Sequence, residues 1–135
     1  MTDNLKVLHI EDDLADAMLL QHALHDGGAF DIEIEVTRTL RDARHKLERS
    51  GYDLVILDLR LPDSASPVDT VRTAEKHANG TPLLVLTGSA GVDAETVGPH
   101  ITLLDKNRCF HGRDRKRSVR LLEQVRDAAD DALHI

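Results

Sequence analysis

The chain has 135 residues, a formal net charge of -7, 2% aromatic residues and no Trp. This length is typical of one domain, and we expect residues 1–135 to form it. The acidic charge argues against general nucleic-acid binding, which needs a positive surface, and against attachment to anionic lipid. Because aromatic residues are few, the core must be aliphatic and a base-stacking surface is not expected.

Cysteine content and targeting signals bear on the compartment. The one cysteine, Cys109, cannot form an internal disulfide, which agrees with a reducing compartment. No basic region followed by a long apolar stretch stands at the start, so no secretion signal is expected. No apolar run reaches the length that crosses a bilayer. We therefore expect a cytoplasmic protein with no membrane partner.

Four short apolar runs alternate with segments of helical periodicity. The runs cover residues 5–10, 53–57, 82–86 and 101–104. Continuous apolar runs of this length, separated by helical patterns, are typical of buried parallel strands. A further strand over 30–36 alternates apolar with acidic residues, which indicates a half-exposed strand at the edge of a sheet.

A helix is predicted after each strand. The predicted helices cover about 14–25, 40–47, 67–78, a short stretch around 93–97, and 114–133. Asp13 and Ser66 are the expected N-caps of the first and third helices. On the last helix we expect a buried stripe of Val119, Leu122, Val125, Ala129 and Leu133. The residues expected to be partly exposed beside it are Leu121, Ala128, Ala132 and Ile135.

The five strand–helix repeats predict an α/β fold, namely a doubly wound, five-stranded parallel sheet of flavodoxin-like type with a stunted fourth helix. Right-handed crossovers and the two edge strands favour the strand order 2-1-3-4-5. In such a sheet, the functional crevice lies outside the carboxyl ends of the strands. This order brings together the strand ends that carry Asp12, Asp58, Thr87 and Lys106.

The motifs VLHIEDD, YDLVILDLRLPDS, PLLVLTG and LLDK resemble the receiver domain of bacterial two-component response regulators, over the whole chain. The resemblance implies that Asp58 accepts a phosphoryl group and that Thr87 and Lys106 assist the transfer. It also implies a bound Mg²⁺ as cofactor. The implied Mg²⁺ ligands are Glu11, Asp12, Asp58 and the backbone carbonyl of Arg60.

The same residues suit this chemistry on physical grounds. A carboxylate can take up a phosphoryl group to give an acyl phosphate. Neighbouring carboxylates repel one another and raise one another's pKa, and Mg²⁺, which prefers oxygen ligands, offsets that repulsion. Charge spreads over the phosphoryl oxygens during transfer. We expect Lys106 and Mg²⁺ to neutralise it and the Thr87 hydroxyl to donate a hydrogen bond.

Each motif taken alone also has an ordinary structural explanation. Glu11-Asp12-Asp13 suits the start of a helix, Thr87-Gly88 suits a turn, and Lys106 suits an exposed surface. The combination at four adjacent strand ends favours the receiver. A doubly wound enzyme is disfavoured, because no Gly-rich phosphate loop follows the first strand and no nucleophile elbow appears.

Two departures from the family pattern favour an alternative, a pseudo-receiver that binds proteins without switching. Leu103 stands where the resemblance implies an aromatic switch residue, and Asn107 stands where it implies proline. The complete acidic set favours a working receiver. We therefore expect a single-domain response regulator that takes a phosphoryl group from a sensor histidine kinase. It is not expected to be an enzyme beyond its own Mg²⁺-dependent phosphorylation and dephosphorylation.

Two finer expectations concern partners. The segments EDDLADA and LPDS look most like regulators that are paired with bacteriophytochromes and related kinases. The apolar residues expected beside the buried stripe of the last helix predict a homodimer through the fifth strand and that helix. Phosphorylation is expected to change its affinity.

Overall fold

The computed structural model describes residues 4–29, 31–64, 66–88, 97–98, 100–110 and 115–130. Its strands form one five-stranded sheet in the order β2-β1-β3-β4-β5, and every neighbouring pair is parallel. The predicted sheet and strand order are therefore confirmed. The strands are β1 (Leu5–Ile10), β2 (Ile32–Thr37), β3 (Leu54–Leu57), β4 (Leu83–Thr87) and β5 (Thr102–Asp105).

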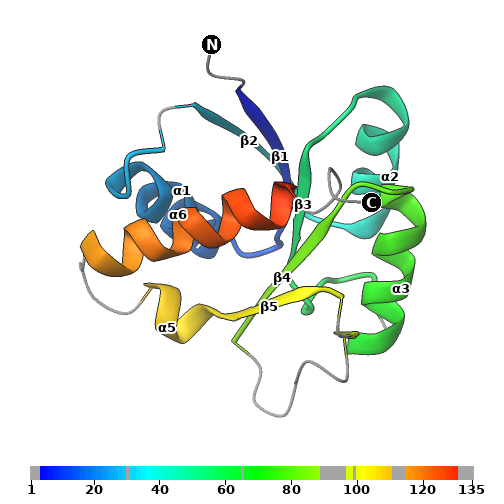
Figure 1. Ribbon diagram of the computed structural model, residues 1–135. Coiled ribbons are helices and arrows are strands. Elements are labelled where there is room, and N and C mark those ends of the chain that lie inside the picture. The colour runs from blue at the N-terminus through cyan, green and yellow to red at the C-terminus, as the bar shows by residue number, and fades with distance from the viewer. Residues whose placement is uncertain are drawn as a thin grey trace.

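Helices cover both faces of the sheet, as the doubly wound prediction requires (Figure 1). One face carries α1 (Leu14–Asp26) and α6 (Arg115–Asp130), and the other carries α2 (Leu40–Arg49) and α3 (Pro67–Ala78). The predicted helix around 93–97 lies outside the described residues except for Val97. Within the described ranges, none of the helices has the length and apolar content of a transmembrane span.

A short helix that the sequence pattern did not predict, α5 (Lys106–Phe110), follows β5 directly. Asp105 begins it, since its Oδ1 accepts a hydrogen bond from the Asn107 N–H at 2.8 Å. A side-chain oxygen that accepts from the first free amides is a normal way to start a helix. A proline at position 107 would have no N–H to donate. Asn107, which differs from the residue expected in the family, therefore permits the hydrogen bond that starts α5.

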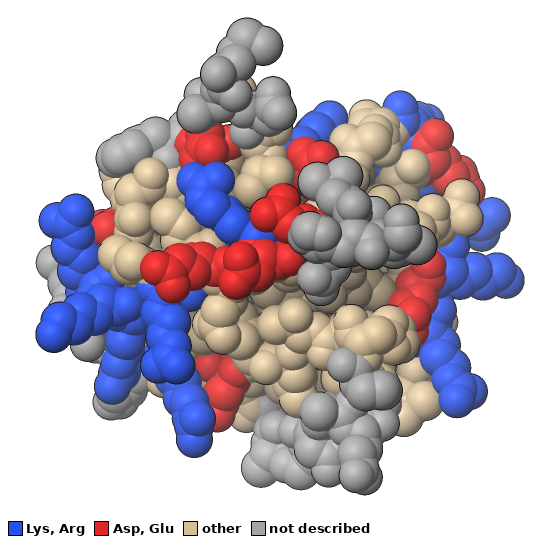
Figure 2. Space-filling view, in the orientation of Figure 1, with Lys and Arg blue, Asp and Glu red and all other residues tan. Residues whose placement is uncertain are grey.

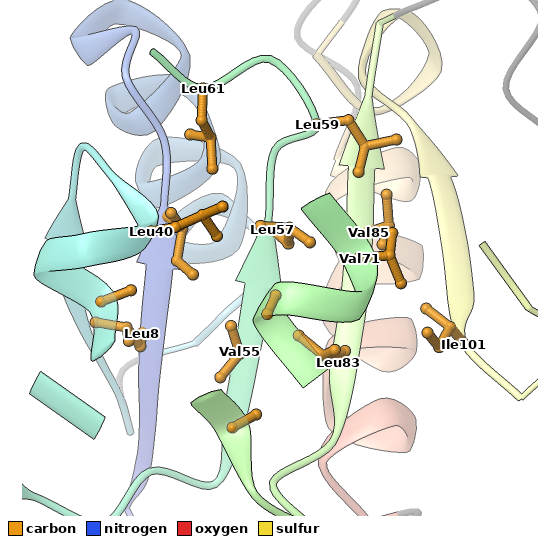
Figure 3. Packing of buried hydrophobic residues seen from close by; sticks show 14 of the residues in the cluster. Leu8, Leu40, Val55, Leu57, Leu59, Leu61, Val71, Leu83, Val85 and Ile101 are labelled. Carbon is orange, nitrogen blue, oxygen red and sulfur yellow. The ribbon is translucent and has the colours of Figure 1, made fainter. Parts of the chain in front are cut away.

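Two aliphatic layers hold the helices against the sheet. The layer under α2 and α3 is shown in Figure 3, where Leu8, Val55 and Val85 of the strands face Leu40 and Val71 of the helices. The opposite layer joins β1, β3 and β4 to α1 and α6. Because both faces of the sheet are covered by apolar contacts, polar chemistry is left to the ends of the strands.

The predicted N-caps of two helices are confirmed. The Asp13 side chain accepts from the N–H groups of Ala15 and Asp16 at the start of α1. Ser66 accepts from the Asp69 N–H at the start of α3, directly before Pro67. These short-range contacts depend on neighbouring residues alone, which is why the sequence pattern could identify them.

The predicted orientation of α6 is wrong in part. Leu122, Val125 and Ala129 are buried as expected, but Val119 is 37% exposed, whereas Leu121 and Ala128 are each 2% exposed. The cause is a close approach between α6 and the end of α1. A Cβ atom on Gly27 would lie 2.6 Å from the carbonyl oxygen of Ser118, so glycine is required there and residue 118 is turned inward. Leu133, Ala132 and Ile135 lie outside the described residues.

The surface of α6 is divided by charge. Arg115, Lys116, Arg117 and Arg120 are exposed on its first half, and Figure 2 shows Lys and Arg side chains gathered over that end of the helix and over α5. Glu123, Asp127 and Asp130 are exposed on its second half. The basic residues lie at the end of the helix where the dipole does not favour them, so the dipole does not account for their position.

A buried histidine lies in the middle of the sheet. His9 on β1 is 0% exposed, and neither ring nitrogen has a hydrogen-bond partner among the described residues. Burial lowers the pKa of His9 to about 4, and the positive charge of Lys106 adds to the effect, against a smaller raising effect of Asp58. His9 is therefore held neutral in the folded protein at neutral pH.

This pKa difference predicts a loss of stability in acid. Below the ordinary histidine pKa of 6.5, His9 is protonated in the unfolded chain but stays neutral in the folded protein. The free energy of unfolding therefore falls from pH 6.5 towards pH 4. The shift of the His9 pKa from 6.5 to about 4 corresponds to a loss of about 3 kcal/mol in the free energy of unfolding once the pH is below 4. Urea unfolding of wild type and His9→Leu at pH 7.5 and pH 5 measures it. Wild type is expected to lose about 2 kcal/mol more than the variant.

The exposed His22 supplies the control for this comparison. His22→Gln removes one imidazole without changing the core and is expected to behave as wild type at both pH values. An equal loss of stability in wild type and His9→Leu would contradict the assignment of the acid sensitivity to His9.

Candidate functional site

The carboxyl ends of the strands bring together most of the predicted site residues. Glu11 directly follows β1, and Asp58 directly follows β3, its N–H donating to the Ile10 carbonyl at 3.0 Å. Thr87 is the last residue of β4, pairs in register with Asp105, and is buried. Lys106 begins α5 directly after β5. The sheet therefore places two carboxyl groups, a hydroxyl and an ammonium at one edge.

Lys106 is the centre of this site. Its Nζ lies 2.6 Å from Glu11 Oε1, 2.8 Å from Asp16 Oδ2 and 3.4 Å from Asp58 Oδ2. The first two contacts are hydrogen bonds, and the third is an ion pair at longer range. The Lys106 side chain is 11% exposed, and that of Glu11 is 0% exposed. One largely buried ammonium thus contacts an acidic residue of α1 and the acidic residues that directly follow β1 and β3.

The charges of this cluster shift the pKa values of its members. Burial lowers the pKa of Lys106, but the hydrogen bonds to Asp16 and Glu11 and the charge of Asp58 outweigh it and hold the pKa above its usual value. Burial, reinforced by the adjacent Asp58, raises the pKa of Glu11 to about 8. Lys106 is therefore an ammonium ion, and it faces the acidic side chains of Glu11, Asp16 and Asp58.

Asp58 is oriented by a second contact. Its Oδ1 accepts from the Arg60 N–H at 3.3 Å, while its Oδ2 faces Lys106. The loop that follows is tied down in turn, because the Ser64 hydroxyl donates to the Leu61 carbonyl at 3.0 Å. Asp63 reaches across to α2 and accepts from the N–H of Leu40 at 3.0 Å. The loop after Asp58 is thereby anchored to the start of α2.

Asp12 has a different partner from its neighbour Glu11. Its Oδ1 lies 3.2 Å from an Nη atom of Arg38 and accepts a hydrogen bond from Arg38 Nε at 3.3 Å. Arg38 lies between β2 and α2, directly after Thr37, whose carbonyl accepts from the Glu11 N–H at 2.8 Å. The acidic pair is thus divided between two cations, Lys106 for Glu11 and Arg38 for Asp12.

The donor set fits a magnesium ion. Among the described residues, no three His, Cys, Asp or Glu side chains form a group that encloses a metal ion by themselves. Mg²⁺ needs no such cage, since it keeps several waters and takes one or two carboxylates. Burial and the adjacent Asp58 raise the pKa of Glu11, and a bound cation would favour its ionised form. Glu11, Asp12, Asp58 and the Arg60 carbonyl supply the hard oxygen atoms that Mg²⁺ prefers.

The sequence pattern did not identify three residues of this site, namely Asp16, Arg38 and Asp63. For Asp16 a signal was present, because it stands four residues after Asp12, one turn along the start of α1. Arg38 and Asp63 contact residues that are 26 and 23 positions away. No local spacing points to such pairs, which only the folded sheet brings together.

Sequence comparison matches this chain to one family. The response regulator receiver domain matches residues 7–98. The cell cycle transcriptional regulator CtrA of Caulobacter vibrioides is 36% identical over 91 residues, which cover 67% of this chain and 38% of CtrA. The chain thus spans well under half of the length of this curated relative.

Solved structures agree with the fold. The signal receiver domain of a LuxO-type repressor from Vibrio parahaemolyticus has a TM-score of 0.71 and 25% identity, over 97% of this chain and 94% of that one. The receiver domain of a Pseudomonas aeruginosa sensor histidine kinase, solved with a magnesium ion in its active-site cleft, has a TM-score of 0.63 and 19% identity, over 90% and 97%. With this fold, this arrangement of strand ends and the family match over residues 7–98, the chain belongs to the receiver domains of two-component response regulators.

Proposed function

We propose that this receiver accepts a phosphoryl group on Asp58 from the phosphohistidine of a sensor histidine kinase, in a Mg²⁺-dependent reaction. The observation that carries the proposal is the position of Lys106, whose ammonium lies 3.4 Å from Asp58 Oδ2 and is held there by Glu11 and Asp16. A buried ammonium beside a carboxylate at a strand end is suited to the charge that develops in phosphoryl transfer.

The transfer exchanges one bond to phosphorus for another. A carboxylate oxygen of Asp58 forms the new P–O bond, and the P–N bond to the kinase imidazole breaks. The electron pair of that bond returns to the ring nitrogen, and the imidazole leaves neutral because its other ring nitrogen carries a proton. The product is an acyl phosphate on Asp58. No further oxidant or reductant is needed.

The neighbouring residues have separate tasks in this proposal. Lys106 neutralises charge on a phosphoryl oxygen. Its carboxylate partners already hold the ammonium beside Asp58, so it needs no large movement to reach a phosphoryl group on that residue. Thr87, at the end of the adjacent strand, supplies a hydroxyl donor. Bound Mg²⁺ supplies Lewis-acid neutralisation of carboxylate and phosphoryl oxygens. Glu11, Asp12, Asp58 and the Arg60 carbonyl would hold it.

The kinase is the proposed partner, and an exposed apolar face near the site supports a docking position. Leu14, Met18 and Leu19 on α1 are 60%, 57% and 44% exposed. Contiguous apolar surface next to a reactive group is typical of a protein-binding site. Pairing with a bacteriophytochrome remains a prediction from the EDDLADA and LPDS segments alone.

A single-domain regulator with a separate output partner remains our proposal for residues 1–135, with the cytoplasm as its compartment. The pseudo-receiver is the alternative, and the aliphatic Leu103, which is partly buried against the layer under α2 and α3, favours it. The intact set of Glu11, Asp58 and Lys106 favours the working receiver. Phosphorylation itself distinguishes the two.

Asp58→Asn is expected to abolish phosphorylation, because an amide is not a comparable nucleophile, while the nearly isosteric side chain preserves the fold. Intact mass after incubation with acetyl phosphate and Mg²⁺ measures the result. Asp127→Asn, on the exposed face of α6, makes the same chemical change away from the site and is expected to label as wild type. Labelling of Asp58→Asn at the wild-type level would show that another residue is the acceptor, and an unlabelled wild type would favour the pseudo-receiver.

Millimolar Mg²⁺ is expected to stabilise the folded protein, because the site is assembled in the native state alone. At tenfold to hundredfold excess over the dissociation constant the gain is about 1–3 kcal/mol. Thermal unfolding across a Mg²⁺ series measures it. Asp12→Ala is expected to remove the gain, and Asp127→Ala to keep it. A melting temperature of wild type that does not respond to Mg²⁺ would contradict the metal assignment.

The proposed homodimer through β5 and α6 has less support in the structure than in the sequence, because Leu121 and Ala128 are buried within the monomer. Its remaining support is the exposed Val119 on α6 and the partly exposed Leu103 on β5. Sedimentation with and without beryllofluoride, a mimic of the phosphoryl group, tests it. A phosphorylation-dependent dimer is the expected result, and a monomer in both states well above micromolar concentration would point to a separate partner.

A further inference from the structure

Two cationic side chains, Lys106 and Arg38, contact the acidic residues of the site, and they differ in solvent exposure. Lys106 is 11% exposed and contacts carboxylates from three elements. The Arg38 side chain is 64% exposed and contacts Asp12, whose own side chain is 39% exposed. Lys106 is therefore a fixed part of the site, whereas Arg38 can leave Asp12 for solvent with little loss of packing.

The position of Arg38 over Asp12 is built into the fold. The register of β1 and β2 pairs Ile10 with Thr37, and the Glu11 N–H continues the pairing to the Thr37 carbonyl. Arg38 is thereby held next to the residues that follow β1. On its other side the chain enters α2, whose first amides are fixed by Asp63 from the loop after Asp58. The guanidinium is thus presented to Asp12 from a segment anchored at both ends.

We propose that Arg38 is an internal counter-ion of Asp12 that a divalent cation must displace, so that it lowers the affinity of the site for Mg²⁺. The inference rests on the proposed Mg²⁺-dependent function. Arg38 and Mg²⁺ carry charge of the same sign and are drawn to the same carboxylate. Removal of the guanidinium frees Asp12 Oδ1 and also removes a repelling charge, so both effects strengthen Mg²⁺ binding.

The consequence is that the Mg²⁺ concentration sets the fraction of receiver molecules that carry bound metal. A surface ion pair between an arginine and a carboxylate is weak, so a divalent cation at sufficient concentration displaces it. Arg38 thereby raises the Mg²⁺ concentration at which the site binds metal, and it does so without contacting Asp58.

Titration calorimetry with MgCl₂ at constant ionic strength tests the proposal on wild type, Arg38→Gln and Arg44→Gln. Arg38→Gln is expected to lower the Mg²⁺ dissociation constant about three- to tenfold. Arg44 is also exposed and pairs with Glu48 on α2, so Arg44→Gln makes the same change in net charge away from Asp12. It is expected to leave the dissociation constant within twofold of wild type.

The outcomes separate this inference from the proposed function. Unchanged or weaker Mg²⁺ binding by Arg38→Gln, in a protein whose binding is lost in Asp12→Ala, would overturn the role of Arg38 and leave the metal site standing. An equal gain in Arg44→Gln would also overturn it, since net charge alone would then explain the effect. Absence of Mg²⁺ binding in wild type would overturn both this role and the metal dependence of the proposed function.

Discussion

The ion-pair cluster around the Lys106 ammonium is the interaction on which the rest of the site depends. Glu11 is fully buried and Asp58 nearly so, and two such carboxylates would repel each other and lose their hydration without a compensating cation. Lys106 contacts both, and it reaches Asp16 on α1 as well. The same ammonium therefore makes the burial of the acids possible and joins β1, β3, α1 and α5 at one edge of the sheet.

The position of this cluster follows from how the sheet is covered. Aliphatic layers close both faces of β1, β3 and β4, so the carboxyl edge is where polar groups can gather without disturbing the core. His9 is the exception, since it lies inside the sheet close enough to Lys106 and Asp58 for their charges to act on it. Its pKa is low mainly because the ring is buried, and the positive charge of Lys106 adds to that effect.

The contacts of Lys106 also connect Asp58 with the first turn of α1. The ammonium that faces Asp58 is hydrogen-bonded to Asp16 in the first turn of α1, next to the exposed Leu14 and close along the helix to Met18. One ammonium therefore contacts both Asp58 and α1. Leu103 on β5 has no polar tip and packs against the aliphatic layer under α2 and α3.

The sequence by itself determined the strands, their order and the chemistry of their ends. The apolar runs before Glu11, Asp58 and Lys106, and the caps at Asp13 and Ser66, depend on neighbouring residues, and local periodicity reports such features well. Tertiary structure alone decided the rotation of α6, because the close approach of Gly27 to Ser118 turns residue 118 inward, so Leu121 and Ala128 are buried with Leu122 and Val125 while Val119 is exposed. It also decided the pairing of Arg38 with Asp12 and of Lys106 with Asp16. These partners are 26 and 90 residues apart, and only the closed sheet makes them neighbours.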